Sequence, residues 1–107
     1  MTFDDYQLAS RRTINPELGD GDRLFDAAAG LAEESGEVLA HVRKQRFQHR
    51  PLDAARLKEE LGDVLWCLST VASALHLTLG EIASDNLTKL RLRYPDGFSL
   101  DRGADTR

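Results

Sequence analysis

The chain has 107 residues, of which 14 are basic and 18 acidic, giving a formal net charge of −4. This length suits one domain, and the acidic balance argues against general binding to nucleic acid or to a membrane surface. Its single cysteine excludes an internal disulfide framework and a cysteine-based metal site. A domain this small buries a modest share of its surface, so we expect oligomerisation to add to its stability.

The N-terminal residues contain no basic segment followed by an apolar run, so the sequence predicts no signal peptide and a cytoplasmic location. The longest dense apolar run, Val64–Leu68, is much too short to span a bilayer. We therefore predict a single domain over residues 1–107. Its polar, small residues 101–107 are expected to form a disordered tail.

Four helices and no strand are predicted, so we expect an all-α helical bundle. The first helix covers about Phe3 to Arg12, and Asn15-Pro16 with Gly19 and Gly21 marks a loop after it. The second helix runs from about Asp22 to Phe47, because apolar residues recur there at the three- and four-residue spacing of one helix face.

The third helix is expected to begin after Asp53, which can act as its N-cap, and to continue to about His76. Thr78-Leu-Gly-Glu81 has the capping-box pattern, so a fourth helix should begin there and run to about Arg93. Val64–Leu68 is apolar on every side of the third helix, which implies burial on more than one side. One small subunit would struggle to cover it, so we expect a homodimer or homotetramer built on helix–helix packing.

Two carboxylate clusters stand out in the middle of the second and third helices: Glu33-Glu34-x-x-Glu37 and Glu60-x-x-Asp63. Residues three apart share a helix face, so Glu34 projects with Glu37 and Glu60 projects with Asp63. If the two helices pack antiparallel, the pairs can face each other. Four oxygen ligands of this kind suit Mg²⁺ or Mn²⁺. Glu33 lies about 100° around the helix and could address a water at the rim of the site.

The alternative interpretation is that these carboxylates are ordinary solvated surface. Like charges at this spacing cost about 0.2–0.5 kcal/mol per pair in an isolated helix. Interior glycines cost about 1 kcal/mol each relative to alanine, and three of them interrupt these helices: Gly30, Gly36 and Gly62. Helix packing explains Gly30 well. Gly36 and Gly62 abut the carboxylates, which favours a site or a close approach at those positions.

A polyanionic substrate would also need positive groups. Asn86, Lys89 and Arg93 share one face of the fourth helix, and Lys44 lies two turns beyond Glu37. Lysine can hold phosphate as a point charge, and arginine can donate a bidentate pair of hydrogen bonds. The alternative is that these residues are solubilising charges.

Three segments together resemble the MazG-like nucleoside triphosphate pyrophosphohydrolases: Gly30–Val38, Glu59–Trp66 and Asn86–Pro95, the last followed by Gly97-Phe98. That family's signature is EExxE, a spacer and ExxD, and the resemblance covers roughly residues 24 to 99. It implies an all-α fold, a helical dimer or tetramer and Mg²⁺. It also implies hydrolysis of a (deoxy)nucleoside triphosphate to the monophosphate and pyrophosphate, in nucleotide-pool house-cleaning.

The resemblance also assigns roles to individual residues. Glu33 would orient or deprotonate the attacking water. Four carboxylates would be the metal ligands: Glu34, Glu37, Glu60 and Asp63. Five residues would be candidates for substrate contacts: Lys44, Asn86, Lys89, Arg93 and Tyr94.

One position departs from the family pattern, because many relatives carry an aromatic residue where this chain has Cys67. That speaks against an inherited base-stacking contact there, and the neighbouring Trp66 is interpreted as a core or interface residue. Three alternatives stay open: a phosphoribosyl-ATP pyrophosphohydrolase, a di-iron bundle and a non-catalytic metal-binding dimerisation module. The di-iron reading is weak, because no histidine follows these glutamates at the Glu-x-x-His spacing. No spacing in the sequence identifies the nucleobase.

Overall fold

A computed structural model describes residues 1–100, so the predicted tail at 101–107 lies outside the described residues. The elements are α1 (Phe3–Ser10), the 3-10 helix η1 (Arg11–Thr13), α2 (Asp20–Gln48), α3 (Ala54–Ala74) and α4 (Leu79–Arg93). Residues 1–100 contain no β-strand, and the predicted all-α fold is confirmed.

The predicted starts of α3 and α4 are confirmed by their capping hydrogen bonds. The Asp53 carboxylate accepts a hydrogen bond from the backbone N–H of Arg56 at 3.1 Å. Thr78 and Glu81 form the expected capping box, with reciprocal side chain–backbone hydrogen bonds of 3.1 and 2.7 Å. These caps satisfy backbone N–H groups that have no partner within the helix, which fixes where each helix begins.

Two predicted boundaries are wrong by a few residues. α2 begins at Asp20, with Gly19 as its extended N-cap, so Gly21 lies inside the helix rather than in the loop. Aspartates in the first turn are favourable there because they face the positive end of the helix dipole. α3 ends at Ala74 because His76 adopts a left-handed backbone conformation, with φ at 58°.

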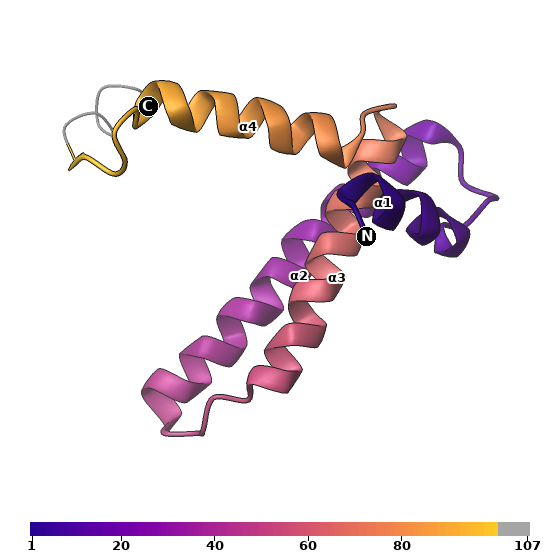
Figure 1. Cartoon of the computed structure of the whole chain (residues 1–107). Coiled ribbons are helices and arrows are strands. Elements are labelled where there is room, and N and C mark those ends of the chain that lie inside the picture. The colour runs from indigo at the N-terminus through magenta and orange to yellow at the C-terminus, as the bar shows by residue number, and fades with distance from the viewer. Residues whose placement is uncertain (101–107) are drawn as a thin grey trace.

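The helices form an antiparallel hairpin with one projecting arm (Figure 1). α2 and α3 lie side by side along the hairpin, and α1 packs near the end where α3 finishes. The axes of α3 and α4 are bent by 100° relative to each other. α4 therefore extends away from the hairpin, and its main contact with another helix is with α1.

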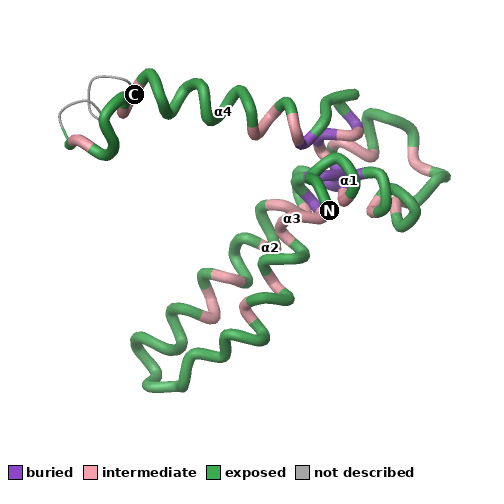
Figure 2. The backbone as a smooth tube through the Cα atoms, in the orientation of Figure 1, coloured by how far each residue is buried: buried purple, intermediate pink, exposed green. Residues whose placement is uncertain are grey.

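The core gathers at the junction of α1, α3 and the start of α4, as the buried segments in Figure 2 show. Gln7, only 2% exposed, is its polar centre. The Gln7 amide nitrogen donates to Ser73 Oγ at 3.0 Å and to the Leu77 carbonyl at 2.9 Å. The Gln7 amide oxygen accepts from the Leu79 backbone N–H at 2.8 Å. One side chain thus ties α1 to both sides of the α3–α4 corner, and leaving such buried groups unpaired would cost about 1–3 kcal/mol each.

The hairpin itself is largely exposed. The expectation that Val64–Leu68 is buried on more than one side is not met within one chain, because Cys67 alone among these residues is buried and Leu68 is exposed. Large apolar side chains are exposed along α2, α3 and α4: Leu39, Leu61, Leu75, Leu87, Leu90 and Leu92. Within residues 1–100 of one copy, these apolar side chains stay exposed to solvent.

The three interior glycines separate into two kinds. A Cβ at Gly30 would lie 3.1 Å from the Cys67 sulfur, so close packing of α2 on α3 explains this residue as predicted. A Cβ at Gly36 or Gly62 would meet nothing within 4 Å. Close approach inside the chain is therefore not the reason for those two glycines.

Within residues 1–100, no single helix is long and apolar enough to cross a membrane. α3 and α4 meet the length and composition requirements only when they are taken together across their 100° bend.

Candidate active site on the α2–α3 seam

The hairpin brings the two carboxylate clusters to one seam. Glu33, Glu34 and Glu37 lie on α2, and Glu60 and Asp63 lie on the facing helix α3. The short link at residues 49–53 makes the helices antiparallel, so the middle of one lies opposite the middle of the other. The carboxylates line two neighbouring hollows along this seam.

The first hollow, of about 380 Å³, combines three of the predicted carboxylates with an apolar lining. Glu33, Glu34 and Asp63 line it together. Its other lining residues are mostly small: Asp26, Ala27, Ala29, Gly30, Trp66 and Cys67. Small side chains on α2 open space beside the carboxylates, and a hollow with both characters can take a ligand that is part charged and part flat and apolar.

The second hollow, of about 260 Å³, lies toward the hairpin link and joins acidic to basic side chains. Glu37 and Glu60 line it with Lys44, Arg50 and Arg56. Lys44 was predicted from the sequence as a substrate contact, and the structure places it in the same hollow as two of the carboxylates. Positive charge and predicted metal ligands are therefore adjacent within one chain.

Glu60 is held in this hollow by a single ion pair. Arg56 Nε lies 3.5 Å from Glu60 Oε1. The other carboxylate oxygen, Oε2, is buried and has no hydrogen-bond partner among residues 1–100. A buried carboxylate oxygen without a donor is costly, and a ligand or cation beside it would relieve that cost.

Negative charges from both clusters lie near Glu34. Partial burial, and then the negative charges of Asp63 and the neighbouring glutamates, raise the pKa of the Glu34 carboxyl above its ordinary value. Carboxylates of both α2 and α3 therefore contribute to the raised pKa of Glu34. Such repulsion between carboxylates is what a bound cation would offset.

Three other side chains lie near the carboxylates Glu34 and Asp63. Burial, followed by the charge of Asp63, raises the pKa of the Tyr6 hydroxyl. Burial, followed by the charge of Glu34, raises the pKa of the Cys67 thiol. The Trp66 indole N–H donates to Thr13 Oγ1 at 2.7 Å, which fixes the half-buried ring at the edge of the first hollow.

The fit of a divalent cation depends on the donors and on their spacing. All four predicted ligands offer carboxylate oxygens, which are the donors that Mg²⁺ prefers. The unpaired Glu60 oxygen and the raised pKa of Glu34 are the features expected where a cation is needed. With the side chains as they lie in residues 1–100, no three histidine, cysteine, aspartate or glutamate residues are close enough to form a ready ligand set. The carboxylate donors are of the kind that Mg²⁺ binds, but their side chains among residues 1–100 are too far apart to bind it as they lie.

The four predicted substrate contacts on α4 are not brought to this seam: Asn86, Lys89, Arg93 and Tyr94. α4 points away from the hairpin, so its basic face lies apart from the carboxylates of the same chain (Figure 1). Lys89 and Arg93 instead border a separate surface hollow of about 390 Å³ on α4. Tyr94 packs against Phe98 in the turn after the helix, with ring centroids 5.7 Å apart.

The sequence interpretation missed Tyr6, Arg50 and Arg56. Arg56 carried a usable signal, because it precedes Glu60 by four residues and therefore shares its helix face. Arg50 lies in the link and Tyr6 lies on α1, so only the folded arrangement reveals their positions. The imidazole Nε2 of His41 accepts a hydrogen bond from the Asp53 backbone N–H at 3.2 Å and so helps to hold the link.

Comparisons with known proteins bear on the family of this chain. A family model described as the MazG nucleotide pyrophosphohydrolase domain matches residues 24–98. The chain is 34% identical over 111 residues to the Gene 37 protein of Mycobacterium phage L5, covering 96% of this chain and 97% of that protein. No solved structure gives a significant match. The residues matched by the family model include both carboxylate clusters and the whole of α4.

Proposed function

This chain belongs to the MazG nucleotide pyrophosphohydrolase family, and from that membership we propose that it hydrolyses nucleoside or deoxynucleoside triphosphates to the monophosphate and pyrophosphate, with Mg²⁺. The observation that carries the proposal is the seam itself. Carboxylates from α2 and α3 lie on both sides of it, and the basic side chains of the second hollow adjoin them.

Four residues would hold the metal in this proposal: Glu34, Glu37, Glu60 and Asp63. When bound, Mg²⁺ would offset the negative charge of the phosphate oxygens, which otherwise repels a nucleophile. A cation would relieve two of these ligands: Glu60, whose buried Oε2 has no hydrogen-bond partner among residues 1–100, and Glu34, whose pKa is raised by partial burial and by neighbouring negative charges.

Glu33 would handle the water. It is exposed at the edge of the first hollow, one position away from the proposed ligand Glu34. Its carboxylate would accept a proton from a water whose oxygen attacks the α-phosphorus. The bond from that phosphorus to the α–β bridging oxygen would break, and the bridging oxygen would leave with pyrophosphate.

Lys44 and Arg56 would hold the phosphate chain. Both line the second hollow beside Glu37 and Glu60, so they would place positive charge next to the carboxylates rather than among them. Arg56 is already oriented by Glu60, which reduces the freedom that it would lose on binding phosphate. The first hollow, with its small apolar lining, would then receive the sugar and base.

A second copy of the chain would complete the site. α4 carries the predicted Lys89 and Arg93 face but extends away from its own hairpin, and the exposed leucines of α3 and α4 leave apolar surface uncovered. A homodimer in which α4 packs on the partner's hairpin would bury that surface and bring basic groups to the partner's carboxylates. We propose that assembly for this chain.

A substrate screen tests the activity. The purified protein would be assayed with the standard ribo- and deoxyribonucleoside triphosphates, several damaged ones and phosphoribosyl-ATP, with Mg²⁺ and with EDTA. We expect Mg²⁺-dependent release of monophosphate and pyrophosphate in equal amounts. Release of orthophosphate and a diphosphate would contradict the proposed bond cleavage.

The same screen separates the rival functions. Turnover confined to phosphoribosyl-ATP would identify the rival pyrophosphohydrolase. A rise in melting temperature with Mg²⁺, but no turnover of any substrate, would identify a non-catalytic metal-binding module.

A further inference from the structure

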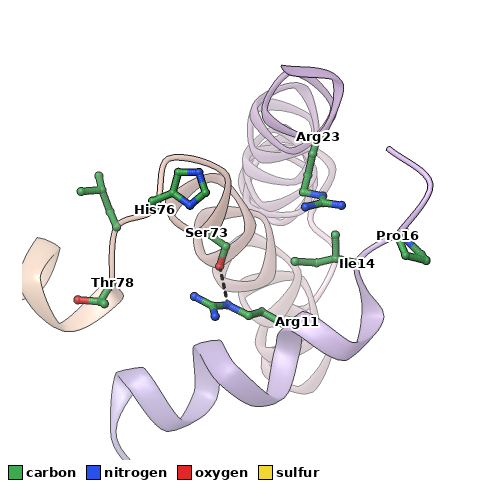
Figure 3. A pocket seen from close by; sticks show the side chains of 8 residues that line it. Arg11, Ile14, Pro16, Arg23, Ser73, His76 and Thr78 are labelled. Carbon is green, nitrogen blue, oxygen red and sulfur yellow. Dashed lines mark hydrogen bonds between the residues drawn. The ribbon is translucent and has the colours of Figure 1, made fainter. Parts of the chain in front are cut away.

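A second cationic pocket lies at the end of the hairpin where α1, α2 and the α3–α4 corner meet. Its volume is about 460 Å³, and Arg11, Arg23 and His76 line it from three different elements (Figure 3). Ile14 and Pro16 provide apolar walls. Arg23 and Glu34 are eleven residues apart on α2, which corresponds to about 16 Å along the helix axis, so this pocket is separate from the carboxylate seam.

Arg23 is a positioned cation. One terminal nitrogen of its guanidinium donates to the Leu18 carbonyl at 2.9 Å and to the Asn15 carbonyl at 3.4 Å. Its Nε–H is buried and has no hydrogen-bond partner among residues 1–100. The loop before α2 therefore holds the side chain in place and leaves one of its donors unmatched.

Arg11 is positioned from the opposite side. Its Nε donates to Ser73 Oγ at 3.3 Å, as Figure 3 shows. Its two terminal nitrogens have no hydrogen-bond partner among the described residues. Arg11 is exposed, and this hydrogen bond leaves its two terminal nitrogens available to a ligand.

The carboxylates near this pocket do not neutralise it. Asp20 is 3.8 Å from Arg23 and 3.9 Å from His76, and its side chain is 70% exposed, so both pairs are loose and screened by water. Asp4 and Glu81 lie on the Thr78 side of the corner and accept hydrogen bonds from backbone N–H groups. Two guanidinium groups therefore face one solvated carboxylate.

We propose that this pocket binds a phosphate group, supplied by inorganic phosphate, by pyrophosphate or by a nucleotide. Guanidinium forks match phosphate oxygens in geometry as well as in charge, and a preoriented arginine loses little freedom on binding. A phosphate between Arg11 and Arg23 would link η1 to α2, next to Ser73 and His76 at the corner. It would thereby stabilise the bend that sets the direction of α4.

Binding should be measured by calorimetry and by NMR without divalent cations, because the metal-free carboxylate seam then repels anions. The ligands are phosphate, pyrophosphate and a nucleoside monophosphate, with chloride at equal ionic strength as the comparison. We expect one site for the phosphate compounds, with chemical-shift changes at Arg11, Arg23 and His76. The tightest of the three ligands identifies the source of the phosphate group.

Variants make the test specific. Arg11→Gln should weaken binding by about tenfold or more, since a charge-assisted hydrogen bond contributes about 1.5–3 kcal/mol. Arg11→Lys should fall between, and Asp20→Asn should tighten binding, because it removes the competing carboxylate. Arg12→Gln is the matched control: Arg12 is the exposed neighbour in η1 and does not line the pocket.

Several results would overturn the proposal. Equal effects of chloride and the phosphate compounds would show general charge attraction, as would equal losses in Arg11→Gln and Arg12→Gln. Shift changes confined to the carboxylate seam would place the anion elsewhere. No saturation of the parent chain at about 10 mM ligand, with its circular dichroism native, would also overturn it. None of these results bears on whether the seam hydrolyses nucleotides.

Discussion

The α2–α3 hairpin and the α4 arm carry complementary halves of the predicted site, but the fold brings together only the residues of the hairpin. The hairpin places carboxylates from two separate segments on one seam and adds Lys44 and Arg56 beside them. α4 keeps its basic face on one side as predicted but projects away from the seam. A short link fixes the geometry of the first region within the chain, whereas the destination of α4 is fixed only at its N-terminal corner.

This difference separates two kinds of functional residue. The carboxylates can be tested as a property of one chain, because α2 and α3 meet without help. In the proposed dimer, the α4 residues act only on the partner's carboxylates, so they must be tested in the assembly. Substitutions on the hairpin and on α4 should therefore lower activity in different ways.

The largest effect is expected from the carboxylates of α3. Glu60→Gln or Asp63→Asn should lower Mg²⁺-dependent turnover by more than about 100-fold, because even the outer partners of metal ligands cost 10- to 100-fold when removed. Secondary structure should be unchanged, since each substitution keeps the size and shape of the side chain and removes only its charge. Glu59→Gln is the matched control, as Glu59 is exposed and lines neither hollow. Near-full turnover by either α3 variant would refute the ligand assignment.

A mixing experiment tests whether α4 acts on a partner. Glu60→Gln and the double variant Lys89→Ala with Arg93→Ala should each be weakly active alone. If each site combines the carboxylates of one chain with α4 of another, unfolding and refolding them together creates mixed dimers with one intact site. Random reassortment then restores roughly a quarter of the parent activity. Activity no greater than the sum of the separate variants would place α4 at its own hairpin or remove it from the site.

The sequence predicts which residues share a helix face better than it predicts how the helices are oriented relative to one another. Helical spacing identified the carboxylate faces of α2 and α3 and the basic face of α4, and the Thr78–Glu81 capping box marked the start of α4. Spacing carries no information on the 100° bend, which depends on the buried Gln7 and its hydrogen bonds across the corner. Arg50 and Tyr6 were missed for the same reason, since their position beside the seam arises only from tertiary packing.

The crowding at Glu34 predicts a pH dependence of stability in the metal-free protein. Because the folded-state pKa of Glu34 is raised, the folded chain holds this proton more tightly than the unfolded chain. Stability should therefore fall as pH rises from the ordinary range of glutamate through the raised pKa, and Glu34→Gln should remove that part of the fall. Thermal melts in EDTA across this range measure it, with Glu59→Gln as the control. Identical pH profiles for the two variants would show that Glu34 is not the crowded group.

The smallest effects distinguish packing inside the chain from packing between chains. Alanine in place of a helical glycine stabilises by about 0.5–1 kcal/mol when space allows. Gly36→Ala and Gly62→Ala should show that gain in urea denaturation if the hairpin is free at these positions, since a Cβ there meets nothing within 4 Å. Gly30→Ala should gain less, because its Cβ would lie 3.1 Å from the Cys67 sulfur, and Cys67→Ala should restore the difference. If Gly36→Ala or Gly62→Ala instead destabilises the protein and shifts it toward a smaller species on size exclusion, the partner's backbone packs against that glycine. The second copy would then cover the seam, and the projecting α4 of one chain would pack against the hairpin of the other.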